Sequence, residues 1–149
     1  MTQEDKELLL KDLCARLPYG VKIEFTWWVM GEGTYINTTL EPDHIEQLLN
    51  DEDGDAEIKP YLRPMSSMTD EEFTKLKEYS GLKYNQLHLK SFQNATSKCL
   101  DFYLGEVPSY VVIKVFDWLN KYHFDYRDLI KMGLAIAVAK ENNLYKRII

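Results

Sequence analysis

A β-hairpin between residues 21 and 40 is the sequence feature that most limits the folds open to this chain. Residues 21–25 alternate apolar with charged side chains, which is typical of a strand with one buried face. Gly31-Glu32-Gly33 supplies a turn, and the β-branched and aromatic residues of 34–40 supply the returning strand. The chain is therefore predicted to contain an antiparallel strand pair.

Helical patterns surround this hairpin. The spacing of leucines and the capping residues predict helices over 2–17, 42–49, 69–80 and 109–122, and a short one between Asp125 and Gly133. Thr69-Asp70-Glu71-Glu72 is a capping box at the start of one of them. Helices around a hairpin indicate the α+β class, with a small, mostly antiparallel sheet and helices packed on one side. The 149 residues are expected to form one domain, 1–149.

Three further segments are less regular. Residues 58–64 are extended but contain Pro60 and Pro64, which favours an edge strand or a structured loop over a central strand. Residues 84–90 suggest a strand, and residues 95–103 suggest a short helix. Residues 134–138 form either a final buried strand or the end of a hairpin.

Charge and apolar content exclude several classes of protein. With 18 Lys+Arg against 24 Asp+Glu, the net charge of −6 counts against binding to a nucleic acid backbone. No apolar run is long enough to span a membrane, and the acidic residues 1–5 are unlike a signal peptide. We therefore expect a cytoplasmic protein without a membrane partner. Cys14 and Cys99 are predicted to be small buried apolar residues.

The sequence contains no pattern of ligands for a metal or a cofactor. The acidic loop 51–57 departs from a calcium loop at Ala56 and Leu62. His44, His88 and His123 are isolated from one another and lack zinc spacing. We expect His123 to cap the end of a helix, and a small enzyme using one of the histidines is the least favoured of three functional hypotheses.

The segment 59–69 is the most unusual one. It combines stiffening prolines, cations and hydroxyl groups with the start of a helix, where backbone N–H groups favour anions. It is the candidate binding site for a small anionic, nucleotide-like ligand, with Lys59, Tyr61, Arg63, Ser66, Ser67 and Thr69 as the site residues. The alternative is purely structural: Thr69 caps its helix, the serines stabilise a turn, and Arg63 pairs with a nearby acid.

The aromatic residues allow a second functional hypothesis. Trp27, Trp28 and Tyr35 are candidates for an exposed surface that contacts a partner protein, because Trp and Tyr supply rigid contact area. The alternative is that most of these rings lie in the core or at its rim.

Three segments carry a resemblance. Residues 12–22 (DLCARLPYGVK), residues 59–69 (KPYLRPMSSMT) with the following 70–72, and residues 117–120 with 123–130 and 133–135 together resemble a family of short uncharacterised proteins from gut bacteria and from their phages and mobile elements. The C-terminal residues 139–143 depart from that family. The resemblance implies an accessory protein inside the host bacterial cell and transfers no catalytic residue.

These observations lead to two main hypotheses. The first is a non-enzymatic protein that binds a small anionic ligand or signal. The second is an interaction module that inhibits a host protein. Neither a cofactor nor a metal is expected, and self-association stays open.

Overall fold

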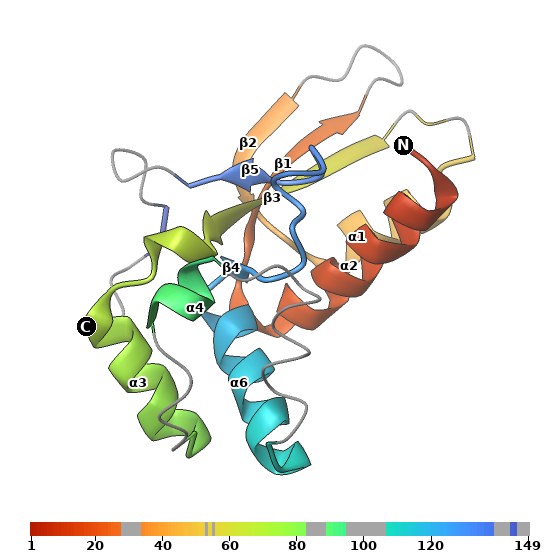
Figure 1. Ribbon diagram of the computed structural model, residues 1–149. Coiled ribbons are helices and arrows are strands. Elements are labelled where there is room, and N and C mark those ends of the chain that lie inside the picture. The colour runs from red at the N-terminus through yellow and green to blue at the C-terminus, as the bar shows by residue number, and fades with distance from the viewer. Residues whose placement is uncertain are drawn as a thin grey trace.

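The computed structural model describes residues 1–27, 34–52, 54, 56–82, 89–94, 107–138 and 144–145. For residues 27 and 34–37 the structure describes the backbone and not the side chains. In chain order the elements are α1 (Gln3–Arg16), a 3-10 turn (Leu17–Tyr19), β1 (Lys22–Trp27), β2 (Thr34–Thr39), α2 (Pro42–Leu49), β3 (Ala56–Pro64), the 3-10 turn η3 (Met65–Ser67), α3 (Asp70–Ser80), α4 (Leu89–Gln93), α6 (Ser109–Lys121), β4 (Phe124–Asp125) and β5 (Ile136–Ala137) (Figure 1).

The strands form one mixed sheet in the order β2-β1-β3-β4, with β5 also beside β3. The long pairings, β1 with β2 and β1 with β3, are antiparallel. The short pairings of β3 with β4 and β5 are parallel. The predicted α+β class, the hairpin within 21–40 and the mostly antiparallel sheet with helices on one side are confirmed.

Strand β3 changes partners along its length. Residues Ala56 to Pro60 pair with β1, residues Tyr61 and Leu62 pair with β5, and the last two residues pair with β4. The interpretation of 58–64 as an edge strand or loop is therefore wrong in its position, because β3 lies inside the strand order. The interpretation is right that the prolines limit the pairing of this strand, because each part of β3 pairs with one neighbour. Pro60 lies where the partner changes and Pro64 lies at the end of the strand, and neither has an N–H to donate.

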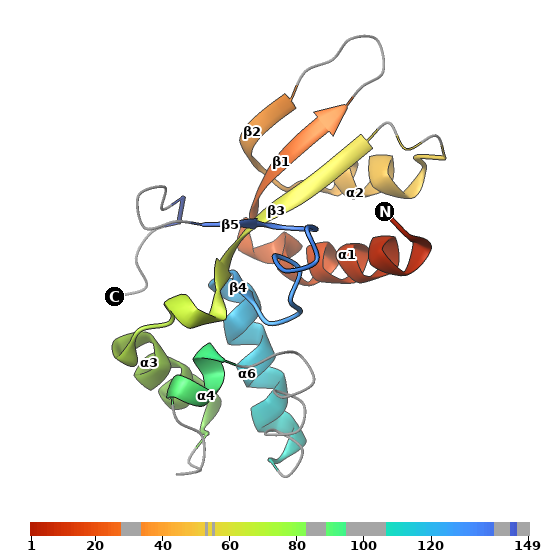
Figure 2. The same cartoon turned by 45° about the horizontal axis from the view of Figure 1, so that its top comes forward.

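Strand β3 also joins two apolar cores. Its first part packs with α1 and α2, where Leu9, Leu13, Ile23, Ile58 and Leu62 are among the buried residues. The second core lies beyond its end, between η3, α3, α4, α6 and β4, and includes Met65, Met68, Phe73, Phe92 and Trp118. Figure 2 shows β3 running from the helices α1 and α2 toward α3, α4 and α6. The two ends of one strand thus lie in two cores.

Several local predictions are corrected. Leu89 begins the short helix α4 instead of ending a strand. Cys14 is exposed, because α1 turns Leu9, Asp12, Leu13 and Arg16 inward and leaves Cys14 on its solvent side. Residues 129–133 form turns instead of a helix, although the carboxylate of Asp125 does accept from the N–H groups of Leu129 and Ile130. Cys99 and residues 95–103 lie outside the described residues.

A buried ion network holds α1 against the segment after β4. The carboxylate of Asp12 accepts from Arg16 Nε at 2.9 Å and from Arg127 Nη1 at 2.8 Å. Arg16 also donates to the carbonyl of Phe124 at 2.7 Å. The side chains of Asp12 and Arg16 are fully buried. One carboxylate therefore serves two arginines from distant parts of the chain.

Removal of the Asp12 charge is expected to destabilise the fold strongly. Asp12→Asn leaves a buried guanidinium without its counter-charge, and breaking a buried pair in this way costs about 3–5 kcal/mol. Urea unfolding measures the change in the free energy of unfolding. Glu78→Gln, which breaks the exposed pair with Lys75, is the matched control and is expected to change that energy by less than about 0.5 kcal/mol. Equal stabilities of the two variants would contradict the role given to Asp12.

Candidate functional site

The predicted anion segment begins on one face of β3. Residues Lys59, Tyr61 and Arg63 alternate with the buried residues Ile58, Pro60 and Leu62, so their side chains share the face that turns away from the α1–α2 core. Lys59 pairs with Glu57 at 3.3 Å, and the Tyr61 hydroxyl donates to Glu24 at 3.5 Å. The structure therefore brings these three residues to one face and gives each of the first two an acidic neighbour.

The guanidinium of Arg63 is already occupied. It donates to both carboxylate oxygens of Glu72, at 2.6 and 2.8 Å, and lies over the ring of Phe124 at 4.2 Å. Its backbone N–H donates to the carbonyl of His123 at 2.7 Å. The side chain of Glu72 is 6% exposed and that of Arg63 is 19% exposed, so the ion pair is a partly buried one.

Thr69 and the start of α3 bind the same carboxylate, that of Glu72. Thr69 Oγ1 accepts from the N–H of Glu72 at 3.2 Å, and the Glu72 carboxylate accepts from the N–H of Thr69 at 3.1 Å. Ser67 Oγ donates to the carbonyl of Pro64 at 2.6 Å, whereas Ser66 is exposed. The anion at this helix N-terminus is therefore Glu72 itself. These are the contacts of the structural alternative, and binding of an external ligand by this segment stays a prediction.

The second predicted surface lies outside the described features. The side chains of Trp27 and Tyr35 are not described, and Trp28 is not described at all. Large apolar side chains that are exposed lie apart on α2, α3, α6 and the turn after β4, namely Leu49, Tyr79, Tyr110, Ile113 and Met132. Only Tyr110 and Ile113 are neighbours on one helix face.

The histidines have different surroundings. His44 Nδ1 accepts from the N–H of Glu41 at 3.0 Å in a cap of α2, and its ring packs against Phe25. His88 lies outside the described residues. Within the described ranges, neither His44 nor His123 forms an ion pair with a carboxylate, so the geometry of a histidine base beside an acid is absent there.

His123 does not have the predicted capping role. It follows α6 with φ 64°, is 5% exposed, and its Nδ1 has no hydrogen-bond partner among the described residues. The ring is stacked on Tyr145 with centroids 4.0 Å apart. Burial, together with the positive charges of Arg16 and Arg63, lowers the pKa of His123 to about 3. The imidazole is therefore neutral at physiological pH.

A pH-dependent loss of stability follows from this pKa. The unfolded imidazole takes up a proton near pH 6.5, but the folded one does so only near pH 3, so stability falls as pH drops through that interval. Between pH 7.5 and 5 the loss is about 2 kcal/mol. Urea unfolding of His123→Asn, since Asn tolerates a positive φ, is expected to show a flatter pH dependence. His44→Asn is the control for losing any one histidine, and a wild-type slope in His123→Asn would refute the assignment.

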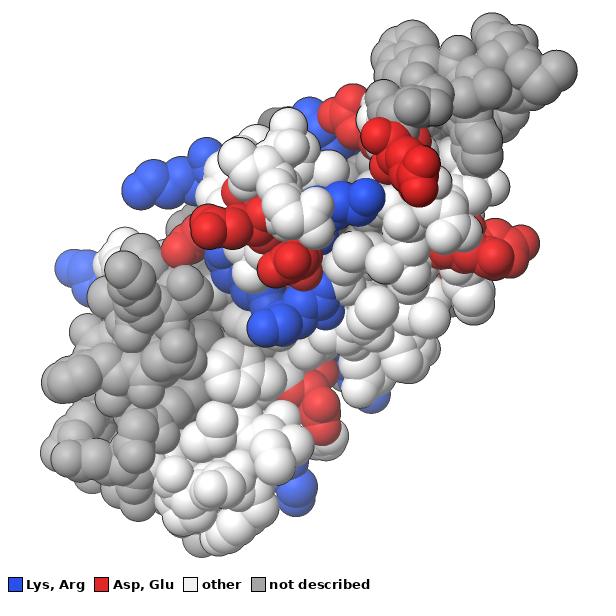
Figure 3. Space-filling view, turned by 90° about the vertical axis from the view of Figure 1, so that its right-hand side faces the viewer, with Lys and Arg blue, Asp and Glu red and all other residues white. Residues whose placement is uncertain are grey.

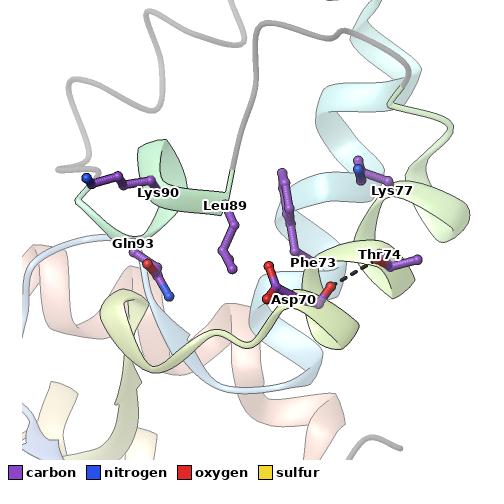
Figure 4. A pocket seen from close by; sticks show the side chains of 7 residues that line it. All are labelled: Asp70, Phe73, Thr74, Lys77, Leu89, Lys90 and Gln93. Carbon is purple, nitrogen blue, oxygen red and sulfur yellow. Dashed lines mark hydrogen bonds between the residues drawn. The ribbon is translucent and has the colours of Figure 1, made fainter.

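A hollow lies between α3 and α4. It has a volume of about 530 Å³ and is lined by Asp70, Phe73, Thr74, Lys77, Leu89, Lys90 and Gln93 (Figure 4). Gln93 donates to the carbonyl of Met68 at 2.8 Å, and Lys77 lies over the Phe73 ring at 4.8 Å. In Figure 4 the Leu89 side chain extends into the space between the two helices. The charged residues of this lining are of both signs, with Asp70 beside Lys77 and Lys90, so they do not favour a ligand of one charge.

A larger hollow, which we call the α1–α6 pocket, lies between α1, α6 and the segment after β4. Its volume is about 760 Å³, and it is lined by Leu8, Lys11, Phe116, Asn120, Tyr126, Arg127, Asp128, Lys131 and Met132. Three cations thus face one carboxylate. Within the described part of the chain, the ammonium groups of Lys11 and Lys131 have neither an ion-pair nor a hydrogen-bond partner.

The wall of the α1–α6 pocket is aromatic and rigid. The rings of Phe116 and Tyr126 contact each other with centroids 5.0 Å apart, and the Tyr126 hydroxyl donates to Asn120 Oδ1 at 2.9 Å. Arg127 lies over the Tyr126 ring at 4.6 Å. Burial raises the pKa of the Tyr126 hydroxyl above its ordinary value. Figure 3 looks onto the side where α1 and α2 lie in Figure 1, and Lys and Arg atoms gather near the centre of that face.

Sequence reasoning missed this pocket. Lys11 and Lys131 are 120 residues apart, and no local pattern joins them. The one available signal was Asp12, a charged residue on the apolar face of a predicted helix, which indicates a buried partner for it.

Comparisons of the chain with protein families, with curated proteins and with solved structures find no match. The described residues contain no cluster of three or more side chains that could hold a metal ion. None of the described helices has the length and apolar character needed to cross a bilayer.

Proposed function

We propose that this chain is a non-enzymatic binding protein for a small anion that carries a flat aromatic group, with a nucleotide as the class of ligand. The binding site is the α1–α6 pocket instead of the segment 59–69. The observation that carries the proposal is that two ammonium groups without described partners border a hollow with an aromatic wall. Such a ligand is compatible with the accessory role inside a host cell that the family resemblance implies, and the protein would then act by sequestering a small signalling molecule.

The cations of the pocket suit a phosphate or carboxylate. Arg127 is oriented by Asp12 at 2.8 Å and by the Tyr126 ring, so its planar N–H groups are held in place before a ligand arrives. Lys11 and Lys131 add two more positive charges to the lining of the pocket. Lys11 comes from α1, and Lys131 comes from the turn after β4. An oriented guanidinium with two lysines is a typical set of donors for an anion.

The remaining lining suits the flat part of the ligand. Phe116, which is partly buried, offers ring surface for stacking, and the buried ring of Tyr126 supports it from behind. Asn120 provides an amide at the same wall. The volume of about 760 Å³ lies within the range of small-molecule sites. The pocket therefore combines charge and aromatic surface, which favours a nucleotide over an inorganic anion.

Substitution of the two lysines tests the proposal. Titration calorimetry with adenosine and guanosine 5′-monophosphates is expected to show binding to the wild-type protein. Lys11→Gln together with Lys131→Gln is expected to weaken that binding by about threefold to tenfold for each lysine, since these side chains are exposed. Adenosine and inorganic phosphate, tested singly, are expected to bind more weakly than the monophosphates because each makes half of the contacts.

The matched control is Lys75→Gln together with Lys114→Gln, which removes two exposed lysines from α3 and α6 outside the pocket lining. It keeps the same net charge as the test variant and is expected to bind within twofold of the wild type. Absence of binding by the wild-type protein at millimolar nucleotide, or an equal loss in both double variants, would refute the proposed function.

A further inference from the structure

The side chain of Tyr145 fills a polar and aromatic seat on the sheet. Its hydroxyl donates to the carbonyl of Tyr61 at 2.6 Å and accepts from the N–H of Lys22 at 2.9 Å. Its ring is stacked on His123, with centroids 4.0 Å apart and an angle of 26° between the planes. We call the groups around it, Lys22, Tyr61 and His123, the phenol seat.

The backbone groups of the phenol seat come from the place where the sheet changes direction. Tyr61 is the first residue of β3 after its pairing with β1 ends, and Lys22 is the first residue of β1. At this junction the hydroxyl joins a carbonyl of one strand to an N–H of the other. A single hydroxyl that both donates and accepts satisfies both groups, which neither an apolar ring nor a carboxylate can do.

The imidazole of His123 completes the seat. It is buried, its Nδ1 has no described partner, and its backbone is in the left-handed region at φ 64°. The left-handed backbone is an ordinary helix ending, since the His123 N–H donates to the Asn120 carbonyl at 3.2 Å, whereas a buried polar atom without a partner is uncommon and calls for an explanation. Arg16 and Arg63 lie close enough to disfavour a charge on this ring, so the ring presents a neutral face for stacking.

We infer that the phenol seat is a binding site for a 4-alkylphenol, and that the chain's own Tyr145 occupies it. Among the described groups, the Tyr61 carbonyl and the Lys22 N–H bind the hydroxyl, and His123 stacks on the ring. The C-terminal tyrosine thus acts as a ligand within the same chain, and a free 4-alkylphenol takes its place when that side chain is removed. The inference does not use the α1–α6 pocket, so each can fail without the other.

Complementation of a truncated side chain tests the inference. Tyr145→Ala is expected to melt at a lower temperature than the wild type, and 4-methylphenol is expected to raise its Tm in proportion to the logarithm of ligand concentration. The wild-type protein, whose seat is filled, is expected to show no such shift. Toluene, which has the ring but no hydroxyl, is expected to raise the Tm of Tyr145→Ala less than 4-methylphenol does. Tyr110→Ala, which truncates a 68% exposed tyrosine, is the matched control and is expected to show no rescue.

A second variant keeps the test decisive if Tyr145→Ala does not fold. Tyr145→Phe retains the stacked ring and loses both hydrogen bonds, so its Tm is expected to fall by about 2–4 °C or more relative to the wild type. Tyr110→Phe is expected to leave the Tm unchanged. The inference is overturned if Tyr145→Phe is as stable as the wild type, if toluene and 4-methylphenol rescue Tyr145→Ala equally, or if 4-methylphenol stabilises the wild type to the same degree.

Discussion

The guanidinium of Arg16 is the group on which the rest of the structure depends. It is fully buried, it pairs with Asp12 of the same helix, and it connects α1 to the first residue of β4 by donating to the Phe124 carbonyl. It also lies 5.5 Å from the centre of the Tyr126 ring, which is part of the α1–α6 pocket wall. Because a buried charge is tolerated only when it is paired and hydrogen-bonded, the positions of α1, β4 and Tyr126 are linked.

The same physical logic operates in the second core. Arg63 and Glu72 form a partly buried, two-bond ion pair that joins the end of β3 to the first turn of α3. Strand β3 cannot make this connection by sheet hydrogen bonds, since it ends at Pro64. The ion pair and the capping box of Thr69 therefore attach α3 to the sheet, next to the pairing of β3 with β4, whose Phe124 also belongs to the second core. Asp12 and Glu72 thus each bind arginines of their own chain.

The elements with local signals could be predicted from the sequence. The hairpin, the capping box at Thr69 and the helix after Pro108 depend on residues close together in the chain, and the structure confirms them. The partner change of β3 could not be predicted, because β4 and β5 are two residues long and have no periodicity of their own. The site at Arg63 looked like an anion site for a sound reason, but the anion is the side chain of Glu72, nine residues further on. A sequence shows which charge a segment attracts, whereas only the fold shows whether the chain itself supplies it.

The α1–α6 pocket contains charges of two kinds: those that hold the fold together, and those that are available to a ligand. Asp12 uses one oxygen for Arg16 and the other for Arg127. Since Arg16 has no carboxylate besides Asp12 in the described ion pairs, a ligand that took Asp12 from its arginines would leave a buried cation unpaired. An anion in the α1–α6 pocket must therefore add to the contacts of Arg127 instead of replacing Asp12. This requirement favours a ligand that approaches from the side of Lys11 and Lys131, where the cations have no described partner, over one that inserts between Arg127 and α1.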